Sequence, residues 1–195
     1  MSSTICEGPA LTANEDEAKI DRLLGAINSV DILITQRTQA RQCPWIMDDG
    51  GRAAAGFKGN AGDCVARAVA IASRRPYAEV YQRLADGNAS QRVTKRMKKS
   101  RAGKRTARDG ISTKRKWFDD YMTELGFEWI PTMQIGQGCK VHLRSEELPS
   151  GRLVVSVSRH MVAVIDGVIH DTYNPSREGT RCVYGYYRLL SGEWS

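Results

Sequence analysis

The chain has 195 residues, of which 41% are apolar and 26% are charged. This length allows one domain with a hydrophobic core and a small extension, and it excludes a disulfide-stapled miniprotein or a fully disordered tail. The apolar runs are far shorter than the roughly 20 residues that cross a bilayer, so we expect no membrane partner.

The first thirty residues lack the basic start, the apolar stretch and the small-residue cleavage site of a secretory signal. We therefore expect a cytoplasmic protein. The five cysteines are an odd number without the spacing of a disulfide framework, which predicts reduced thiols.

The formal charge of +7 is concentrated in one segment. Residues 92–116 hold twelve Lys or Arg and one acid, a balance of +11, whereas the rest of the chain sums to −4. We interpret this segment as a basic insertion, partly disordered, in a slightly acidic domain. It is typical of a solvated surface or of sequence-independent nucleic-acid binding.

The N-terminal 44 residues are expected to form an extension, part of it disordered, with one helix. Asn14 and Glu17 have the spacing of a capping box, and an apolar stripe follows, which together predict a helix over residues 15–28. A short strand is expected at residues 31–35, and irregular loop after it up to residue 51.

A glycine-rich loop, residues 56–62, precedes Asp63 and Cys64. The alanine-rich run that follows, with a single charge, predicts a buried helix with Cys64 in its first turn. A second helix is expected with Pro76 at its first position, and a third from a cap at Ser112-Thr113 to Gly126.

The C-terminal third predicts strands, because it is rich in Val, Ile and Tyr between turn residues. Asp166-Gly167 between two apolar residues is the signal of a two-residue hairpin. Helices followed by an antiparallel sheet indicate an α+β fold. The expected strands cover residues 153–158, 160–165, 168–172 and 182–189.

The two-residue turn fixes the register of this hairpin. The predicted pairs are Ile165 with Val168, Val164 with Ile169, Val162 with Asp171, and His160 with Tyr173. Asp171 is then the diagonal neighbour of His160 on one face, at a backbone separation of roughly 7 Å that two polar side chains can close. Asn174 has the opposite parity, and it stays as an alternative orienting residue if the strand ends before it.

A histidine oriented by a carboxylate lacks only a nucleophile to form a triad. Cys64 is the best candidate, because a helix N-terminus and a protonated His160 would both lower the pKa of its thiol. The backbone N–H groups of that helix end would stabilise an oxyanion. The arrangement predicts a cysteine hydrolase that uses no cofactor.

The order of a glycine-rich loop, an Asp-Cys pair opening a helix, then His and Asp on successive strands resembles the papain-like cysteine peptidase fold. The likeness is especially to compact bacterial branches such as the bacteriocin-leader-processing peptidases. Over residues 45–190 the chain more closely resembles a family of uncharacterised phage and prophage proteins. The matching segments are Asp49 to Phe57, Gly62 to Ala68, Gly138 to Leu143, and His160 to Asp171.

This resemblance implies a papain-like domain over residues 45–195, interrupted by the basic insertion, in a protein of the host cytoplasm if phage encoded. It implies Cys64 as nucleophile, His160 as general base and Asp171 as orienting residue, acting on a peptide or protein substrate. Papain-like enzymes place a Gln before the Cys to complete the oxyanion hole. Here that position is Lys58, and Asn60 is the nearest amide that can substitute.

The alternative is a catalytically inactive papain-like scaffold that binds nucleic acid, or another acidic partner, weakly through residues 92–116. The candidate contacts are Lys95, Arg96, Lys98, Lys99, Arg101, Lys104 and Arg105.

Metal binding is a further hypothesis, because Cys139, His142, His170 and Cys182 have side chains of the kinds that bind zinc. Only the first two are close in sequence, so we expect no metal.

Overall fold

The computed structural model describes residues 13–40, 43–59, 62–90 and 105–190. The chain divides into two compact units, residues 1–40 and 41–195. The predicted disorder before residue 13, and the basic insertion from residue 92 to 104, lie outside the described residues.

The first unit contains one helix, α1, Ala13–Ala40. The strand predicted at residues 31–35 is wrong, because Val30 and Ile34 continue the helical spacing of the stripe that starts at Ile20. The apolar side chains of this stripe are all more than half exposed. No helix in the described ranges is long and apolar enough to cross a membrane.

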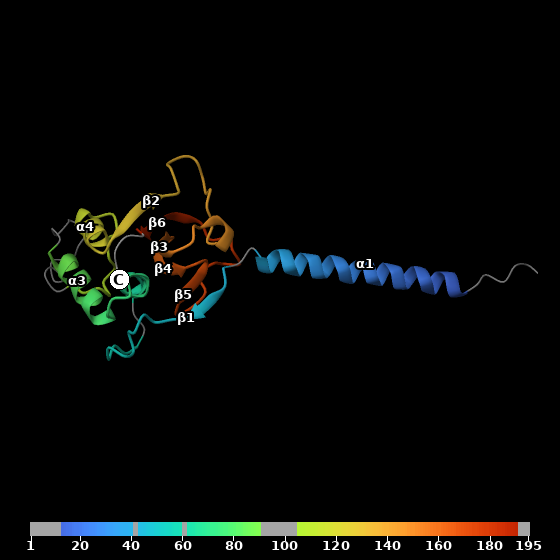
Figure 1. Ribbon diagram of the computed structural model, residues 1–195, viewed down its shortest axis with the longest axis horizontal. Coiled ribbons are helices and arrows are strands. Elements are labelled where there is room, and N and C mark those ends of the chain that lie inside the picture. The colour runs from blue at the N-terminus through green and yellow to red at the C-terminus, as the bar shows by residue number, and fades with distance from the viewer. Residues whose placement is uncertain (1–12, 41–42, 60–61, 91–104, 191–195) are drawn as a thin grey trace, which may run out of the picture. The chain divides into compact units, whose positions relative to one another are not determined.

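The second unit is built on a six-stranded sheet in the order β1-β5-β4-β3-β6-β2 (Figure 1). Its strands are β1 Trp45–Met47, β2 Phe127–Pro131, β3 Arg152–Val157, β4 His160–Ile165, β5 Val168–Asp171 and β6 Val183–Leu189.

The α+β class and the antiparallel pairing of the C-terminal strands β3, β4, β5 and β6 are confirmed, whereas the edge strand β1, which was not predicted, runs parallel to β5. The sequence analysis assigned β1 to irregular loop and left out β2. Strand β1 has only three residues, all exposed at the sheet edge, so it lacks the alternating burial that marks a strand.

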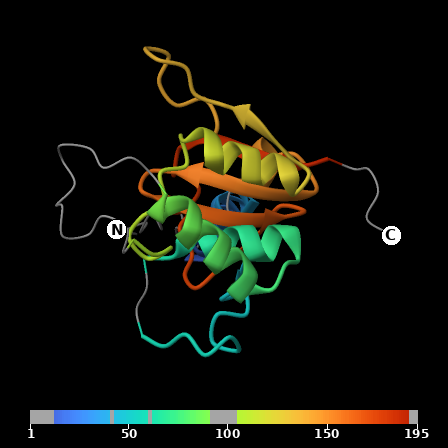
Figure 2. The same ribbon diagram turned by 90° about the vertical axis from the view of Figure 1, so that its left-hand side faces the viewer.

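Three helices cover one face of the sheet, α2 Cys64–Ser73, α3 Tyr77–Ala89 and α4 Lys116–Glu124 (Figure 2). Pro76 is the capping residue before α3 rather than its first residue. A short 3-10 helix, η2 Ser145–Glu147, lies between β2 and β3.

Two hydrophobic clusters bury both faces of the sheet. One joins α2, α3 and α4 to Val154, Met161, Ala163 and Tyr187. The other, on the opposite face, contains side chains of β3, β4, β5 and β6, together with the buried Cys43. Burial on both faces explains why β3 and β4 are continuous apolar runs rather than alternating ones.

The hairpin of β4 and β5 has the predicted register, with Ile165 opposite Val168 and Val164 opposite Ile169. Both turn residues have positive φ, 48° at Asp166 and 78° at Gly167, as the tightest hairpin turn requires. Strand β5 ends at Asp171, so this carboxylate lies at the end of the sheet.

Candidate active site

Cys64 is the first residue of α2, as predicted, and its side chain is partly buried. Asp63 precedes it in the capping position, but its carboxylate makes no capping hydrogen bond. Because the first N–H groups of a helix have no partner within the helix, this end of α2 presents donors beside the thiol.

His160 begins β4 and Asp171 ends β5, and their side chains meet as predicted. His160 Nε2 lies 2.5 Å from Asp171 Oδ2. Asp171 thus engages only Nε2 of the ring, while Cys64 and His160 line the same cavity and shift each other's pKa. The structure therefore brings together the three residues of the predicted triad.

The carboxylate of Asp171 is almost fully buried and its second oxygen is also engaged. Oδ1 accepts hydrogen bonds from the backbone N–H of Thr172 at 2.7 Å and from Arg67 Nη2 at 3.3 Å. These donors fix the carboxylate and therefore the orientation of the His160 ring.

Arg67 belongs to a buried charge cluster that the sequence analysis did not recognise. Its Nη1 donates to Asp63 Oδ1 at 2.7 Å, and Arg52 Nε donates to Asp63 Oδ2 at 2.8 Å. Tyr77 donates its hydroxyl to the same carboxylate. Arg52 also donates to the carbonyls of Phe57 and Lys58, which holds the loop before Cys64.

One signal in the sequence pointed to this cluster. Arg67 is the single charge in the alanine-rich run, and it follows Asp63 by four residues, the spacing of an ion pair on one helix face. A lone charge on a buried helix needs a buried partner of opposite sign.

The surroundings lower the pKa of Cys64 below its ordinary value. Burial alone raises the pKa, but the hydrogen bond with His160, a backbone hydrogen bond from Met161 and the charges of His160 and Arg67 outweigh it. Each of these contacts stabilises the thiolate, which is the nucleophilic form of cysteine.

The pKa of His160 is raised to about 9. Burial lowers it, but the hydrogen bonds with Asp171 and Cys64 and the negative charges of both partners prevail. Because the thiol becomes more acidic and the imidazole more basic, the pair favours thiolate and imidazolium at neutral pH.

A cavity of about 570 Å³ gives access to this pair. Cys64 and His160 line it, together with Arg159 and Tyr173. The ring of Tyr173 lies 5.2 Å from that of His160, centroid to centroid. The side chain of Cys64 thus lines an accessible cavity.

One predicted site residue does not join this group, and another lies outside the described residues. The prediction of Asn174 as the alternative orienting residue is wrong. Asn174 is exposed, and its Oδ1 accepts a hydrogen bond from the N–H of Ser176 at 2.9 Å. Because β5 ends at Asp171, the chain turns away before Asn174. Asn60, the oxyanion candidate, lies outside the described residues.

Of the nucleic-acid candidates, only Arg105 lies in the described residues. Its guanidinium donates to the carbonyls of Asp109 and Gly110, both at 3.3 Å. Arg108 in the same segment lies over the ring of Phe57, 5.8 Å from its centroid. This part of the basic segment is therefore folded against its own turn and the loop before Cys64.

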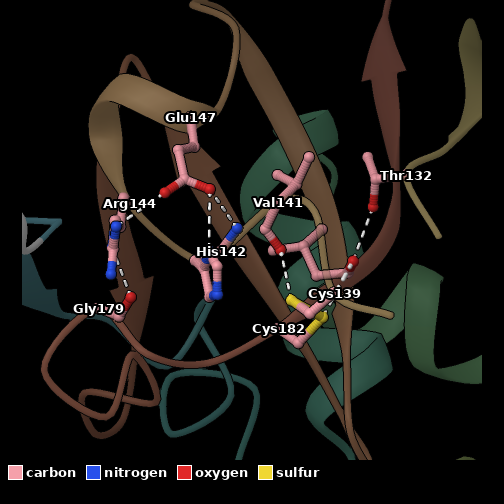
Figure 3. Close-up of a disulfide and its surroundings, with 9 residues drawn as sticks. Thr132, Cys139, Val141, His142, Arg144, Glu147, Gly179 and Cys182 are labelled. Atoms are coloured by element: carbon pink, nitrogen blue, oxygen red, sulfur yellow. Dashed lines mark hydrogen bonds and ion pairs between the residues drawn. A yellow bond between two sulfur atoms is a disulfide. The ribbon is translucent and has the colours of Figure 1, made fainter. Parts of the chain in front are cut away.

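The expectation of five reduced thiols is wrong for Cys139 and Cys182, which form a disulfide (Figure 3). The bridge joins the loop after β2 to the residue before β6, where His142 and Cys182 also form a β-bridge. Sequence spacing alone did not show this pairing, because 43 positions separate the two residues.

The two histidines considered as metal ligands, His142 and His170, each contact a carboxylate. Nδ1 of His142 lies 3.1 Å from Glu147, and Nδ1 of His170 lies 3.1 Å from Asp48 (Figure 3 for the first pair). In the described ranges, no three His, Cys, Asp or Glu side chains gather as a metal site.

Comparison with known proteins gave no relative. The chain matches no family model, no curated protein and no solved structure.

Proposed function

We propose that this protein is a cysteine hydrolase with a papain-like arrangement, which cleaves a peptide or isopeptide bond. The observation that carries the proposal is the contact of Cys64 with His160, whose far nitrogen is held by the buried Asp171. The three residues come from three different elements, the start of α2, the start of β4 and the end of β5.

The reaction follows from the protonation states of this pair. The Cys64 thiolate attacks the carbonyl carbon, a C–S bond forms, and the negative charge moves to the carbonyl oxygen. His160 gives its Nδ1 proton to the leaving nitrogen as the C–N bond breaks, which leaves a thioester and a neutral imidazole.

Water completes the cycle. The neutral His160 removes a proton from the water, whose oxygen attacks the thioester carbonyl, and the C–S bond then breaks. The acid is released, and the thiolate and imidazolium are restored. Throughout, Asp171 holds the ring and stabilises its positive charge.

The oxyanion is stabilised by the N-terminal N–H groups of α2, including that of Cys64. They are free for this role because the carboxylate of Asp63 is directed to Arg52 and Arg67 instead. Losing one oxyanion donor typically lowers the rate by about 10² to 10³. The charge cluster thus keeps this helix end open while fixing its position.

The experiment is hydrolysis of a quenched-fluorescence peptide library by wild type and Cys64→Ala. Cys43→Ala is the matched control, because Cys43 is the other described cysteine outside the disulfide and it is buried. We expect cleavage by wild type and by the control, and none by Cys64→Ala. Cleavage that persists in Cys64→Ala would exclude this mechanism.

A further inference from the structure

A second cavity, of about 930 Å³, adjoins the catalytic one. The two share four lining residues, Thr113, Lys114, Ser156 and Tyr184. A molecule bound at Cys64 therefore reaches the second cavity without leaving the protein surface. The mechanism above uses none of the residues that line only this second cavity.

The second cavity has mainly apolar walls. The large apolar lining residues are Trp129, Pro131, Met133, Ile135, Tyr184 and Tyr187, and the charged residues Lys114, Arg115, Lys116 and Asp119 also line the cavity. Trp129 is 37% exposed, Tyr184 is 39% exposed and Ile135 is fully exposed. Large apolar side chains gathered around an exposed hollow are typical of a binding site rather than of a core.

An irregularity in β6 places Tyr184 at the junction of the two cavities. Against β3, Ser156 pairs with Gly185 and Val157 pairs with Val183, so Tyr184 is an extra residue in the ladder. Such a bulge redirects a side chain and is common beside active sites. Val183 and Tyr186 both remain in the buried cluster, whereas Tyr184 lines both cavities.

Gly185 gives the cavity its aromatic wall. A Cβ at this position would lie 2.4 Å from the ring of Trp129, so only glycine lets the indole lie across β6. The indole then packs at 4.8 Å from the ring of Tyr187. At the junction, Ser156 lines both cavities with a small side chain.

We infer that the second cavity is a substrate subsite that takes a bulky apolar side chain, aromatic or long aliphatic, from the peptide segment next to the scissile bond. This inference rests on the proposed function and specifies its substrate class. The passage at Ser156 and Tyr184 connects the scissile carbonyl at Cys64 to the side chain in the aromatic pocket.

The test compares alkylation rates of Cys64 by small probes that need no turnover. The probes are chloroacetyl-Phe-Gly-amide, chloroacetyl-Gly-Phe-amide and chloroacetyl-Gly-Gly-amide, and labelling at Cys64 is followed by mass spectrometry. We expect one of the Phe probes to react about tenfold faster than the Gly-Gly probe, because its ring leaves water on binding.

Two variants and one control assign this preference to the cavity. Met133→Asp and Trp129→Ala are expected to reduce the Phe-to-Gly rate ratio to below about threefold. Leu190→Asp is the matched control, since Leu190 is 49% exposed and lines neither cavity. It is expected to keep the wild-type ratio. The ratio is the readout because a general weakening of the site lowers both rates together.

The possible outcomes distinguish failure of the subsite from failure of the proposed hydrolase function. A ratio near one in wild type, or an unchanged ratio in both cavity variants, overturns the subsite. If Cys64 reacts with the Gly-Gly probe no faster than an unfolded-peptide thiol at neutral pH, the proposed hydrolase fails, and the subsite fails with it. Melting temperatures identify any variant that does not fold.

Discussion

Arg67 Nη2 lies 3.3 Å from Asp171 Oδ1, so one guanidinium links the helix that carries Cys64 to the strand that carries the triad carboxylate. The same guanidinium donates to Asp63 at 2.7 Å. The nucleophile candidate lies on α2 and the carboxylate on β5, and this buried contact is one that holds these two elements together.

Replacing Arg67 is therefore expected to reduce both stability and thiol reactivity. Arg67→Met leaves Asp63 and Asp171 as buried carboxylates with one partner fewer, which costs about 3–5 kcal/mol of unfolding free energy. Urea denaturation measures this. The Arg67→Met substitution also removes a positive charge that lowers the pKa of Cys64, so the pKa of Cys64 is expected to rise.

An exposed pair serves as the control for this substitution. Arg83 contacts Glu124 at 3.1 Å, but both side chains are about half exposed. Arg83→Met is expected to cost less than about 1 kcal/mol, because water screens the pair. Equal losses for Arg67→Met and Arg83→Met would show that the buried cluster does not stabilise the site.

The thiolate itself is open to direct measurement. The rate of iodoacetamide alkylation of Cys64 against pH is expected to give a pKa below the ordinary value of a cysteine. His160→Ala removes the hydrogen bond and the charge that lower this pKa, so the pKa rises. Equal Cys64 pKa values in wild type and His160→Ala would contradict the role of His160 in stabilising the thiolate.

Activity is expected to fall at alkaline pH, because the leaving nitrogen needs the His160 proton. The alkaline limb of kcat/KM should lie near pH 9, where His160 titrates. Asp171→Asn keeps the shape but removes the negative charge that raises this pKa, so the limb moves to lower pH. An unmoved limb would contradict the role given to Asp171.

The raised pKa of His160 also predicts how stability depends on pH. The folded pKa of His160, about 9, lies above the roughly 6.5 of an unfolded histidine. His160 therefore contributes stability that is complete below pH 6.5 or so and is lost as pH rises through about 9. His160→Ala should flatten this part of the stability curve in thermal unfolding, and an unchanged slope would contradict the shift.

Reduction of the disulfide is expected to lower stability without removing the triad. Cys139 and Cys182 lie 43 positions apart, and a bridge closing a loop of this size typically contributes about 2–4 kcal/mol. Wild type should lose this amount in reducing buffer. Cys139→Ser is the control, since reductant should leave its urea midpoint unchanged. A wild-type urea midpoint that does not change with reductant would show that the disulfide does not contribute to stability.

Local sequence patterns correctly predicted several helices and strands and one part of the candidate site. The alanine-rich run predicted α2 with Cys64 at its start, and Asp166-Gly167 predicted the hairpin and its register. The pair His160 and Asp171 followed from that register, because a two-residue turn leaves one alignment of the strands. These are short-range consequences of backbone geometry.

The contacts between segments distant in sequence became evident in the three-dimensional structure alone. The three-residue β1, the partners of Arg67, the Cys139–Cys182 bridge and the aromatic cavity all depend on contacts between distant segments. Periodicity reports which face of an element is apolar, but not which neighbour covers it. The contact of Cys64 with His160 is of this kind, because only packing of α2 against β4 brings the sulfur to the ring.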